Sequence, residues 1–414
     1  MADNPYRPGA AHAPPYLAGR EAEQREFSRL LKQTPVLENL VLTGIRGIGK
    51  TVLMREALRK DAAENGWLWV GSDISEAASV SENHLVRRLL TDLNTFSADW
   101  EYSSSERYPL GFTEVAEHQT IHFDYQTMMT LFKREPGLSS DKIKRILLVA
   151  WELMQKHMPD KKGIIFAWDE AQNLADRSEV DQYPLGVLLD VFSSLQSQGV
   201  PFMLLLTGLP TLFPKLVDSR TYAERMFRVM TLDNLNYDES REAIAKPLDK
   251  VPEQIKNFFN SFSDDIYDLT KGYPYFIQFW CRELYDYLAG TRPDVDEDGA
   301  EAEVMERISR KLDMDFFEAR WARLTDRQRD LLSIIAQLEN SSGEFTVQEI
   351  VEGSKRTEQA FSSSHANQML NSLFAKGLIF KNRHGKYVLA VPLLDQYIRR
   401  RITGDDTHKE NDHD

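Results

Sequence analysis

An apolar strand that runs into a glycine-rich turn constrains this chain more than any other feature of its sequence. Residues 40–43 read Leu-Val-Leu-Thr, and the motif G-x-x-x-x-G-K-T follows at 44–51. Glycines let such a backbone curl with its N–H groups around phosphates, while Lys50 adds positive charge and Thr51 a ligand for Mg²⁺. A helix is expected over 52–58, with its positive end toward the same phosphates. The strand and the helix favour a phosphate-binding loop over an ordinary glycine-rich turn.

Two further strands end in polar residues suited to the same chemistry. Asp169 and Glu170 follow the apolar strand 163–168, and Thr207 follows the apolar strand 202–206. Ligands bind at this edge of open α/β sheets, so Asp169 would hold Mg²⁺ and Glu170 would accept a proton from the attacking water. Thr207 would orient that water or the γ-phosphate. The alternatives are that the two carboxylates cap the next helix and that the threonine only forms a turn.

The segment 220–228 carries arginines of a kind used in phosphoryl transfer. Arginine stabilises charge on the transferred group, often from a neighbouring subunit. Arg225 is the first candidate for this role and Arg228 the second. The alternative for Arg225 is a surface ion pair with Glu224 or Asp218.

The order of elements predicts an α/β core followed by helices. Strands that are apolar throughout and alternate with helices indicate a parallel sheet covered on both faces. Strand signals stop near Asn236, and from Leu324 the pattern becomes three helices and a hairpin. The expected parts are an extended arm over 1–16, a nucleotide-binding core over 17–235 with an insertion at about 94–140, a helical lid over 236–320, a winged helix over 321–402 and a polar tail over 403–414.

Composition excludes several classes of protein. A single cysteine, Cys281, rules out a disulfide framework and a cysteine-based zinc site, and fits a reducing cytoplasm. No apolar run of 18 residues is present, so no membrane span is expected. The net charge of −14 argues against a surface covered with nucleic-acid contacts. Residues 321–402 nevertheless carry +4, against −18 for the rest of the chain.

The basic C-terminal part is the candidate DNA-binding module. Its third helix is expected over 363–376, and its hairpin joins strands at 378–381 and 386–390. Amide side chains suit base edges and cations suit phosphates, so duplex DNA is one expected partner. The alternative is a module that contacts protein, because the serines at 362–364 do not form a base-reading surface. The residues expected at DNA are His365, Asn367, Gln368 and Asn371 in the groove and Lys381, Arg383 and Lys386 at the phosphates.

These motifs, with Gly-Arg-Glu at 19–21, Glu-Arg-Met-Phe at 224–227 and Gly-Tyr-Pro at 272–274, resemble the AAA+ superfamily. They are most similar to the branch shared by STAND signalling ATPases and archaeal-type origin initiators, over about 16–401 without the insertion. The resemblance implies an ATPase that binds ATP and Mg²⁺ and assembles with copies of itself. It implies catalytic roles for Glu170, Lys50, Thr207 and Arg225, Mg²⁺ ligation by Thr51 and Asp169, and nucleotide contacts by Arg20, Gly44, Arg46, Gly47, Ile48, Gly49, Lys50, Thr51, Val52 and Pro274.

One departure from the family pattern concerns the lid. Many members carry an arginine near the position where this chain has Gly-Tyr-Pro, and only Lys271 and Arg282 lie close by in sequence. Slow hydrolysis is therefore expected. Two functions fit the resemblance: a cytoplasmic switch that couples ATP or ADP to oligomerisation and DNA engagement, and a STAND-type ATPase of bacterial stress or antiphage defence. In the second, the winged helix contacts a separately encoded protein partner.

Overall fold

The structure is a computed structural model that describes residues 3–9, 12–103, 120–290, 300–357, 359–383 and 385–410. The chain divides into two compact units, which are described separately. The sheet unit contains Arg20–Gly44 and Lys50–Leu232, and the helical unit contains Met1–Gly19, Ile45–Gly49 and Asp233–Asp414.

A five-stranded parallel sheet forms the centre of the sheet unit. Its order is β2-β5-β6-β1-β7, and the register places Leu42 of β1 beside Thr207 of β6. Strands β1, β5 and β6 are buried along their whole length, as expected of a sheet covered on both faces. The strands are β1 (Asn39–Thr43), β2 (Trp67–Val70), β5 (Gly163–Trp168), β6 (Phe202–Gly208) and β7 (Phe227–Thr231).

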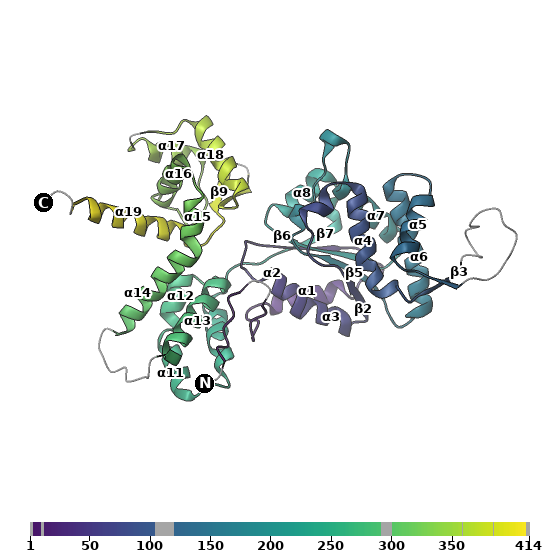
Figure 1. Ribbon diagram of the computed structural model, residues 1–414, viewed down its shortest axis with the longest axis horizontal. Helices are drawn as coiled ribbons and strands as arrows, with labels where there is room; N and C mark the ends of the chain where they lie inside the picture. Colours follow the sequence, from purple (N-terminus) through teal and green to yellow (C-terminus); the bar gives the residue numbers. More distant parts are fainter. Residues whose placement is uncertain are drawn as a thin grey trace. The chain divides into compact units, whose positions relative to one another are not determined.

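Helices cover both faces of this sheet (Figure 1). One face carries α1 (Glu21–Leu30) and a continuous helix built from α2 (Lys50–Val52), the π-helical stretch η1 (Leu53–Leu58) and α3 (Arg59–Glu64). The other face carries α4 (Glu82–Ser97), α7 (Pro184–Ser197) and α8 (Leu212–Ser219). The expected α/β core is therefore present.

The expected insertion contributes to the core of the sheet unit. It contains the antiparallel pair β3 (Glu101–Ser103) and β4 (Thr120–His122), the helix α5 (Tyr125–Arg134) and the start of α6 (Ser139–His157). Helix α5 lies within the expected insertion at about 94–140. Its buried Met128 and Phe132 join the same apolar cluster as α4, α6 and α7. Residues 104–119 lie outside the described part of the chain.

The helical unit begins with lid helices that the N-terminal arm contacts. The arm has no regular secondary structure, but Tyr6 is buried, its hydroxyl donates to the carbonyl of Ile244 (2.5 Å), and its ring stacks on Phe259 with centroids 5.5 Å apart. These contacts fasten the arm to the lid. The lid helices are α10 (Tyr237–Ala245), α11 (Glu253–Ser261), α12 (Ser263–Thr270) and α13 (Pro274–Gly290), followed by α14 (Ala300–Leu312), η6 (Asp313–Glu318) and α15 (Ala319–Ala322). The acidic stretch at 294–298 lies outside the described residues.

Three helices and a hairpin end the helical unit, in the predicted order. Thr325 and Thr346 cap the first two helices through capping boxes with Gln328 and Glu349, and Ser362 caps the third by accepting a hydrogen bond from the backbone N–H of His365. A final helix reaches Glu410, so the stretch expected to be a polar tail is helical over most of its length. The elements are α16 (Asp326–Ala336), α17 (Val347–Ser354), α18 (Ser363–Ala375), β8 (Ile379–Arg383), β9 (Lys386–Leu389) and α19 (Leu394–Glu410).

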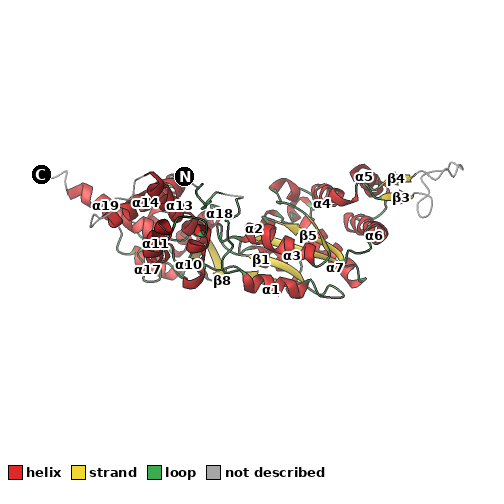
Figure 2. Ribbon diagram, turned by 90° about the horizontal axis from the view of Figure 1, so that it is seen from below, coloured by secondary structure: helices red, strands yellow, loops and turns green. Residues whose placement is uncertain are grey.

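Figure 2 shows that the two units differ in secondary structure: most strands lie in the sheet unit, whereas β8 lies among helices in the helical unit.

Within the described ranges, no helix combines the length and the apolar character that crossing a membrane would require.

Candidate functional site

The phosphate loop has the backbone that its glycines predict. Gly44, Gly47 and Gly49 have φ values of 157°, 76° and 98°, a region that other residues rarely adopt. Lys50, at the start of α2, is buried, and its ammonium donates to the carbonyl of Gly44 at 2.9 Å. The ammonium group of Lys50 therefore lies close to the end of β1, where the loop begins.

A single buried carboxylate collects hydroxyl groups from two other elements. Thr51, in α2, donates to Oδ2 of Asp169 at 2.5 Å, and Thr207, at the end of β6, donates to Oδ1 of the same carboxylate. The backbone N–H of Glu170 also donates to Oδ1, at 2.8 Å. Asp169 is 2% exposed and Thr207 is fully buried. The fold therefore brings together three of the residues that the sequence predicts, from three separate segments.

The oxygen atoms of Thr51 and Asp169 fit Mg²⁺. A carboxylate and a hydroxyl are hard ligands, and Mg²⁺ commonly takes only one or two protein oxygens and completes its shell with water and substrate phosphates. Among the residues that the structure describes, no three His, Cys, Asp or Glu side chains gather as a metal cage. The donor set suits a metal that arrives with a nucleotide, rather than one held by the protein alone.

Glu170 is held by a neighbour that sequence reasoning missed. Its backbone is left-handed, with φ 53° and ψ 33°, and its carboxylate Oε2 accepts a hydrogen bond from the side-chain amide of Gln172. The other end of that amide, Oε1, accepts from the backbone N–H of Leu209 at 3.1 Å. Glu170 precedes only the short turn η3 (Ala171–Asn173) and makes no side-chain cap there. The geometry does not favour the alternative in which Glu170 serves as a helix cap.

The two candidate arginines have different surroundings. Arg228, in β7, forms ion pairs with Glu26 (3.5 Å) and Glu38 (3.3 Å). Arg225, in the short helix α9 (Ala223–Met226), is exposed, and its guanidinium has no ion pair or hydrogen bond within the described residues. The predicted alternative, pairing with Glu224 or Asp218, is absent there as well. Arg225 is thus free to reach another molecule.

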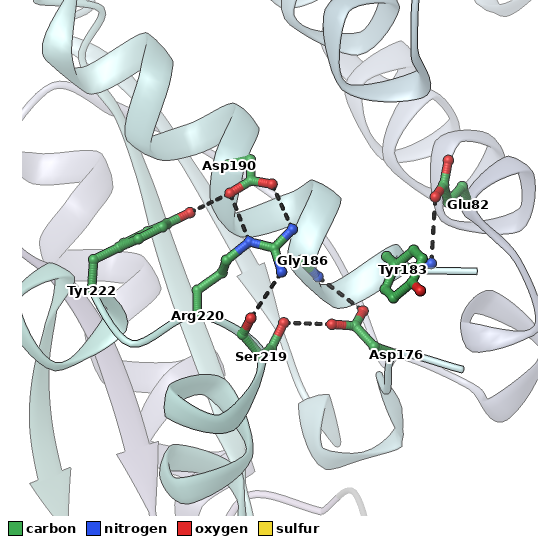
Figure 3. Close-up of polar contacts among 8 residues, drawn as sticks. All are labelled: Glu82, Asp176, Tyr183, Gly186, Asp190, Ser219, Arg220 and Tyr222. Atoms are coloured by element: carbon green, nitrogen blue, oxygen red, sulfur yellow. Dashed lines mark hydrogen bonds and ion pairs between the residues drawn. The ribbon is translucent and has the colours of Figure 1, made fainter. Parts of the chain in front are cut away.

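The segment before Arg225 is anchored by a polar network (Figure 3). Arg220 forms two hydrogen bonds with Asp190 of α7, Nε to Oδ1 at 2.9 Å and Nη2 to Oδ2 at 2.7 Å, and the Tyr222 hydroxyl donates to Oδ1 at 2.6 Å. Ser219 donates to Asp176 at 2.5 Å. Burial raises the pKa of Asp190, but the bonds from Arg220 and Tyr222 outweigh it, and the net pKa lies below the ordinary value.

The remaining predicted nucleotide residues occur at two places. Arg20 is buried at the N-cap position of α1, with its Nη1 3.8 Å from Glu23. In the helical unit, Pro274 opens α13, and the preceding Tyr273 donates its hydroxyl to the carbonyl of Arg46 in the phosphate loop. A Cβ on Gly47 would lie 2.2 Å from that hydroxyl, so position 47 requires glycine.

Both lid cations near the Gly-Tyr-Pro motif lie close to acidic side chains of the helical unit. Lys271 pairs with Asp268 at 3.2 Å, and Arg282 lies 3.8 Å from Asp286. Both are exposed at the surface of the helical unit. Slow hydrolysis stays a prediction.

The predicted DNA-facing residues that the structure describes differ in their exposure. Asn367, Gln368 and Asn371 are exposed on α18, whereas the His365 ring is half-buried against Phe361, with centroids 5.1 Å apart. On the hairpin, Lys381 is exposed and Lys386 is half-buried, while the side chain of Arg383 lies outside the described part.

Part of the basic charge in this region is neutralised internally. On α19, Arg399 donates to the carbonyl of Ala336 at 2.6 Å. Arg400 pairs with Asp313 at 2.6 Å and Arg401 pairs with Glu318. The arginines of α19 therefore stabilise the helical unit and leave α18 and the hairpin as the candidate nucleic-acid surface.

Comparison with known proteins identifies the sheet unit. Residues 16–206 match the AAA ATPase domain family, and residues 314–398 match a domain of unknown function, DUF8462. No curated protein sequence matches the chain. The structure is similar to the Aeropyrum pernix ORC2 protein in its ADP form, at 14% identity and a TM-score of 0.53, over 95% of this chain and 97% of that one. The ADPNP–ADP complexes of the same protein match at 14% identity and 0.53, over 96% and 98%. These findings confirm the resemblance to the AAA+ superfamily and the expected fold class.

Proposed function

We propose that the protein is an ATP-hydrolysing molecular switch, because residues 16–206 match the AAA ATPase domain family. The observation that carries the proposal is the Asp169 carboxylate, which Thr51 and Thr207 contact from two other segments. These contacts support a site at the end of β5 in which Thr51 and Asp169 would bind the metal, Thr207 would act as the sensor hydroxyl and Glu170, the next residue, would act as the base. Such positioning is the main contribution a protein makes to phosphoryl transfer.

In this proposal each residue has a separate task. Lys50 and the N–H groups of the phosphate loop bind the β- and γ-phosphates. Thr51 and Asp169 would hold Mg²⁺, which neutralises negative charge on the phosphates when it is bound. Glu170 accepts the proton of the water that forms the new P–O bond, as the bond from the γ-phosphorus to the leaving oxygen breaks. Thr207 orients that water.

Arg225 would complete the site of a neighbouring copy. Its guanidinium is exposed and has no partner within the described residues, and the Arg220–Asp190 contacts fix the segment that precedes it. An arginine that arrives from another subunit links hydrolysis to assembly. We therefore include homo-oligomerisation in the proposed function.

Engagement of duplex DNA is the proposed output. The exposed amides of Asn367, Gln368 and Asn371 suit base edges, and the exposed Lys381 suits a phosphate. Binding that depends on phosphate contacts weakens steeply with salt, so titration of a labelled duplex at several salt concentrations tests this part. Lack of binding at low salt, in both nucleotide states, would favour the STAND-type alternative with a protein partner.

Mass photometry tests the whole proposal. Wild type and Glu170→Gln are measured with ADP or ATP, with and without duplex DNA, and Glu179→Gln serves as an exposed control. Larger assemblies that need ATP and DNA, and that Glu170→Gln traps, are expected. A mass that changes with ATP alone, or only after a partner protein is added, would replace the DNA-linked switch with a signalling switch.

A further inference from the structure

We propose that Gln172 is a positioning residue for hydrolysis, which fixes the carboxylate of Glu170 and ties it to the end of β6. The inference rests on the proposed function, because it assigns Glu170 the role of proton acceptor. Gln172 lies two residues after Glu170 in the turn η3. Its side chain and its backbone both form hydrogen bonds with residues of neighbouring segments.

The amide of Gln172 bridges two strand ends. Its Nε2 donates to Oε2 of Glu170, after β5, and its Oε1 accepts from the N–H of Leu209, after β6, at 3.1 Å. Leu209 lies two residues beyond Thr207, whose hydroxyl is bound to Asp169. A displacement of the end of β6 would therefore move both the sensor hydroxyl and the glutamine that holds the glutamate.

The backbone under Gln172 is held on both sides. Lys215 of α8 donates its ammonium to the carbonyl of Gln172 at 2.5 Å, and the side chain of Asn173 donates to the carbonyl of Ile74 at 2.8 Å. Burial lowers the pKa of Lys215, although the nearby Asp176 opposes this. Because the turn is fixed, the position of the amide is defined as well.

Gly208 gives independent support for this close approach. It lies in β6 and has no positive φ, so its backbone does not require glycine. A Cβ at position 208 would lie 2.6 Å from Oε1 of Gln172 and 2.9 Å from Cδ2 of Leu212. The absence of a side chain at this position is what lets the glutamine reach the end of β6.

Among side chains of this length, only glutamine carries both the donor that contacts Glu170 and the acceptor that contacts Leu209. A glutamate at 172 would accept from Leu209 but repel Glu170, and a methionine would make neither hydrogen bond. A general base must hold its carboxylate within about 3 Å of the proton that it abstracts, so freeing the side chain of Glu170 lowers the fraction of productive encounters.

Steady-state ATP hydrolysis of Gln172→Met and Gln172→Glu tests the inference. We expect kcat to fall about 10- to 100-fold in both, with KM changed less than about threefold, because only the catalytic step uses the oriented carboxylate. The control is Gln196→Met. Gln196 also joins two strands, through Asn39 Oδ1 and the carbonyl of Phe202, both at 2.7 Å, but at the opposite ends of β1 and β6. Its loss should lower the unfolding temperature and leave kcat within about twofold.

A double-mutant cycle separates positioning from a merely structural role. With Glu170→Gln as background, Gln172→Met should change the residual rate less than about twofold, because the carboxylate that it orients is gone. The inference alone would be overturned if the losses of activity caused by the two substitutions are additive. It would also be overturned if Gln172→Met keeps full activity although Glu170→Gln is inactive. A wild type that binds a fluorescent ATP analogue without hydrolysing ATP would overturn the proposed function as well. If Gln172→Met does not fold, Gly208→Ala, which displaces the amide, takes its place.

Discussion

Thr207 donates a hydrogen bond to Oδ1 of Asp169, although the two residues lie 38 positions apart in the chain. This contact joins the ends of two adjacent strands, β5 and β6, at the carboxylate that also accepts from Thr51. Thr51, Asp169 and Thr207, the proposed metal ligands and the proposed sensor, therefore form one cluster, in which each residue can be changed separately.

Replacing Thr207 with valine should slow hydrolysis more than it weakens binding. Valine keeps the shape and removes the hydroxyl, and a hydrogen bond to a charged group contributes about 1.5–3 kcal/mol, so we expect turnover to fall about 10- to 100-fold. Steady-state hydrolysis and titration with a fluorescent ATP analogue measure the two effects. Thr95→Val, which removes a hydroxyl that donates to the carbonyl of Asp92 in the same helix, is the control. Equal losses of turnover and affinity would contradict a catalytic role.

Lys50→Ala should weaken nucleotide binding without unfolding the sheet unit. The ammonium supplies the positive charge at the phosphate loop, and a charged hydrogen bond of about 1.5–3 kcal/mol predicts an affinity loss of about 10- to 100-fold. The control is Lys60→Ala in α3, an exposed lysine that pairs with Glu64 of the same helix. Fluorescence titration and circular dichroism measure affinity and folding. Unchanged affinity in Lys50→Ala would exclude a phosphate-binding role for this loop.

Arg225→Ala should lower turnover while nucleotide affinity persists. If Arg225 acts on a neighbouring copy, the turnover per molecule of wild type rises with protein concentration, and the variant loses this rise. The control is Arg228→Ala, which breaks surface ion pairs with Glu26 and Glu38 and should cost at most about 1 kcal/mol of stability. Wild-type turnover that does not depend on concentration would rule out action in trans.

Asp190→Asn should destabilise the protein in a pH-dependent way. The pKa of Asp190 lies below its ordinary value of 3.8, because the hydrogen bonds from Arg220 and Tyr222 outweigh the effect of burial. A carboxyl group of this kind adds stability above its unfolded pKa, and this contribution disappears as the pH falls through the folded value. Asp190 is 41% exposed, so solvent screens the pair and the effect is modest.

Thermal unfolding at pH 7 and at pH 3 or below measures this effect. The difference in unfolding temperature between wild type and Asp190→Asn should shrink toward acid pH. Tyr222→Phe, which keeps the Arg220–Asp190 pair and removes one donor, should show a smaller difference with the same trend. A difference that is the same at both pH values would show that charge at Asp190 does not contribute.

The sequence predicts the central strands because burial on both faces leaves an uninterrupted apolar pattern. Strands β1, β5 and β6 are of this kind. The polar residues Asp169 and Thr207, at the ends of β5 and β6, follow from the same pattern. Strand β7 escapes this reasoning, since it lies at the edge of the sheet and carries an exposed Arg228. An edge strand with one solvated side resembles a loop in its pattern.

The contacts among site residues were harder to predict than the residues themselves. The phosphate loop, Asp169 and Glu170 follow from motifs whose residues are adjacent in the chain. Gln172 does not, because its partner Leu209 lies 37 positions away, and only the folded sheet brings the two together. The same holds for Tyr273, whose contact with Arg46 spans 227 positions.

The left-handed backbone of Glu170 implies a trade-off between stability and activity. This conformation costs a residue with a side chain about 1–2 kcal/mol, and glycine adopts it freely. Glu170→Gly should therefore unfold at a higher temperature than Glu170→Ala, although neither can accept a proton. Glycine, the residue that fits this turn with the least strain, lacks the carboxylate that the proposed reaction requires, so the turn keeps a strained backbone at the position proposed for the base.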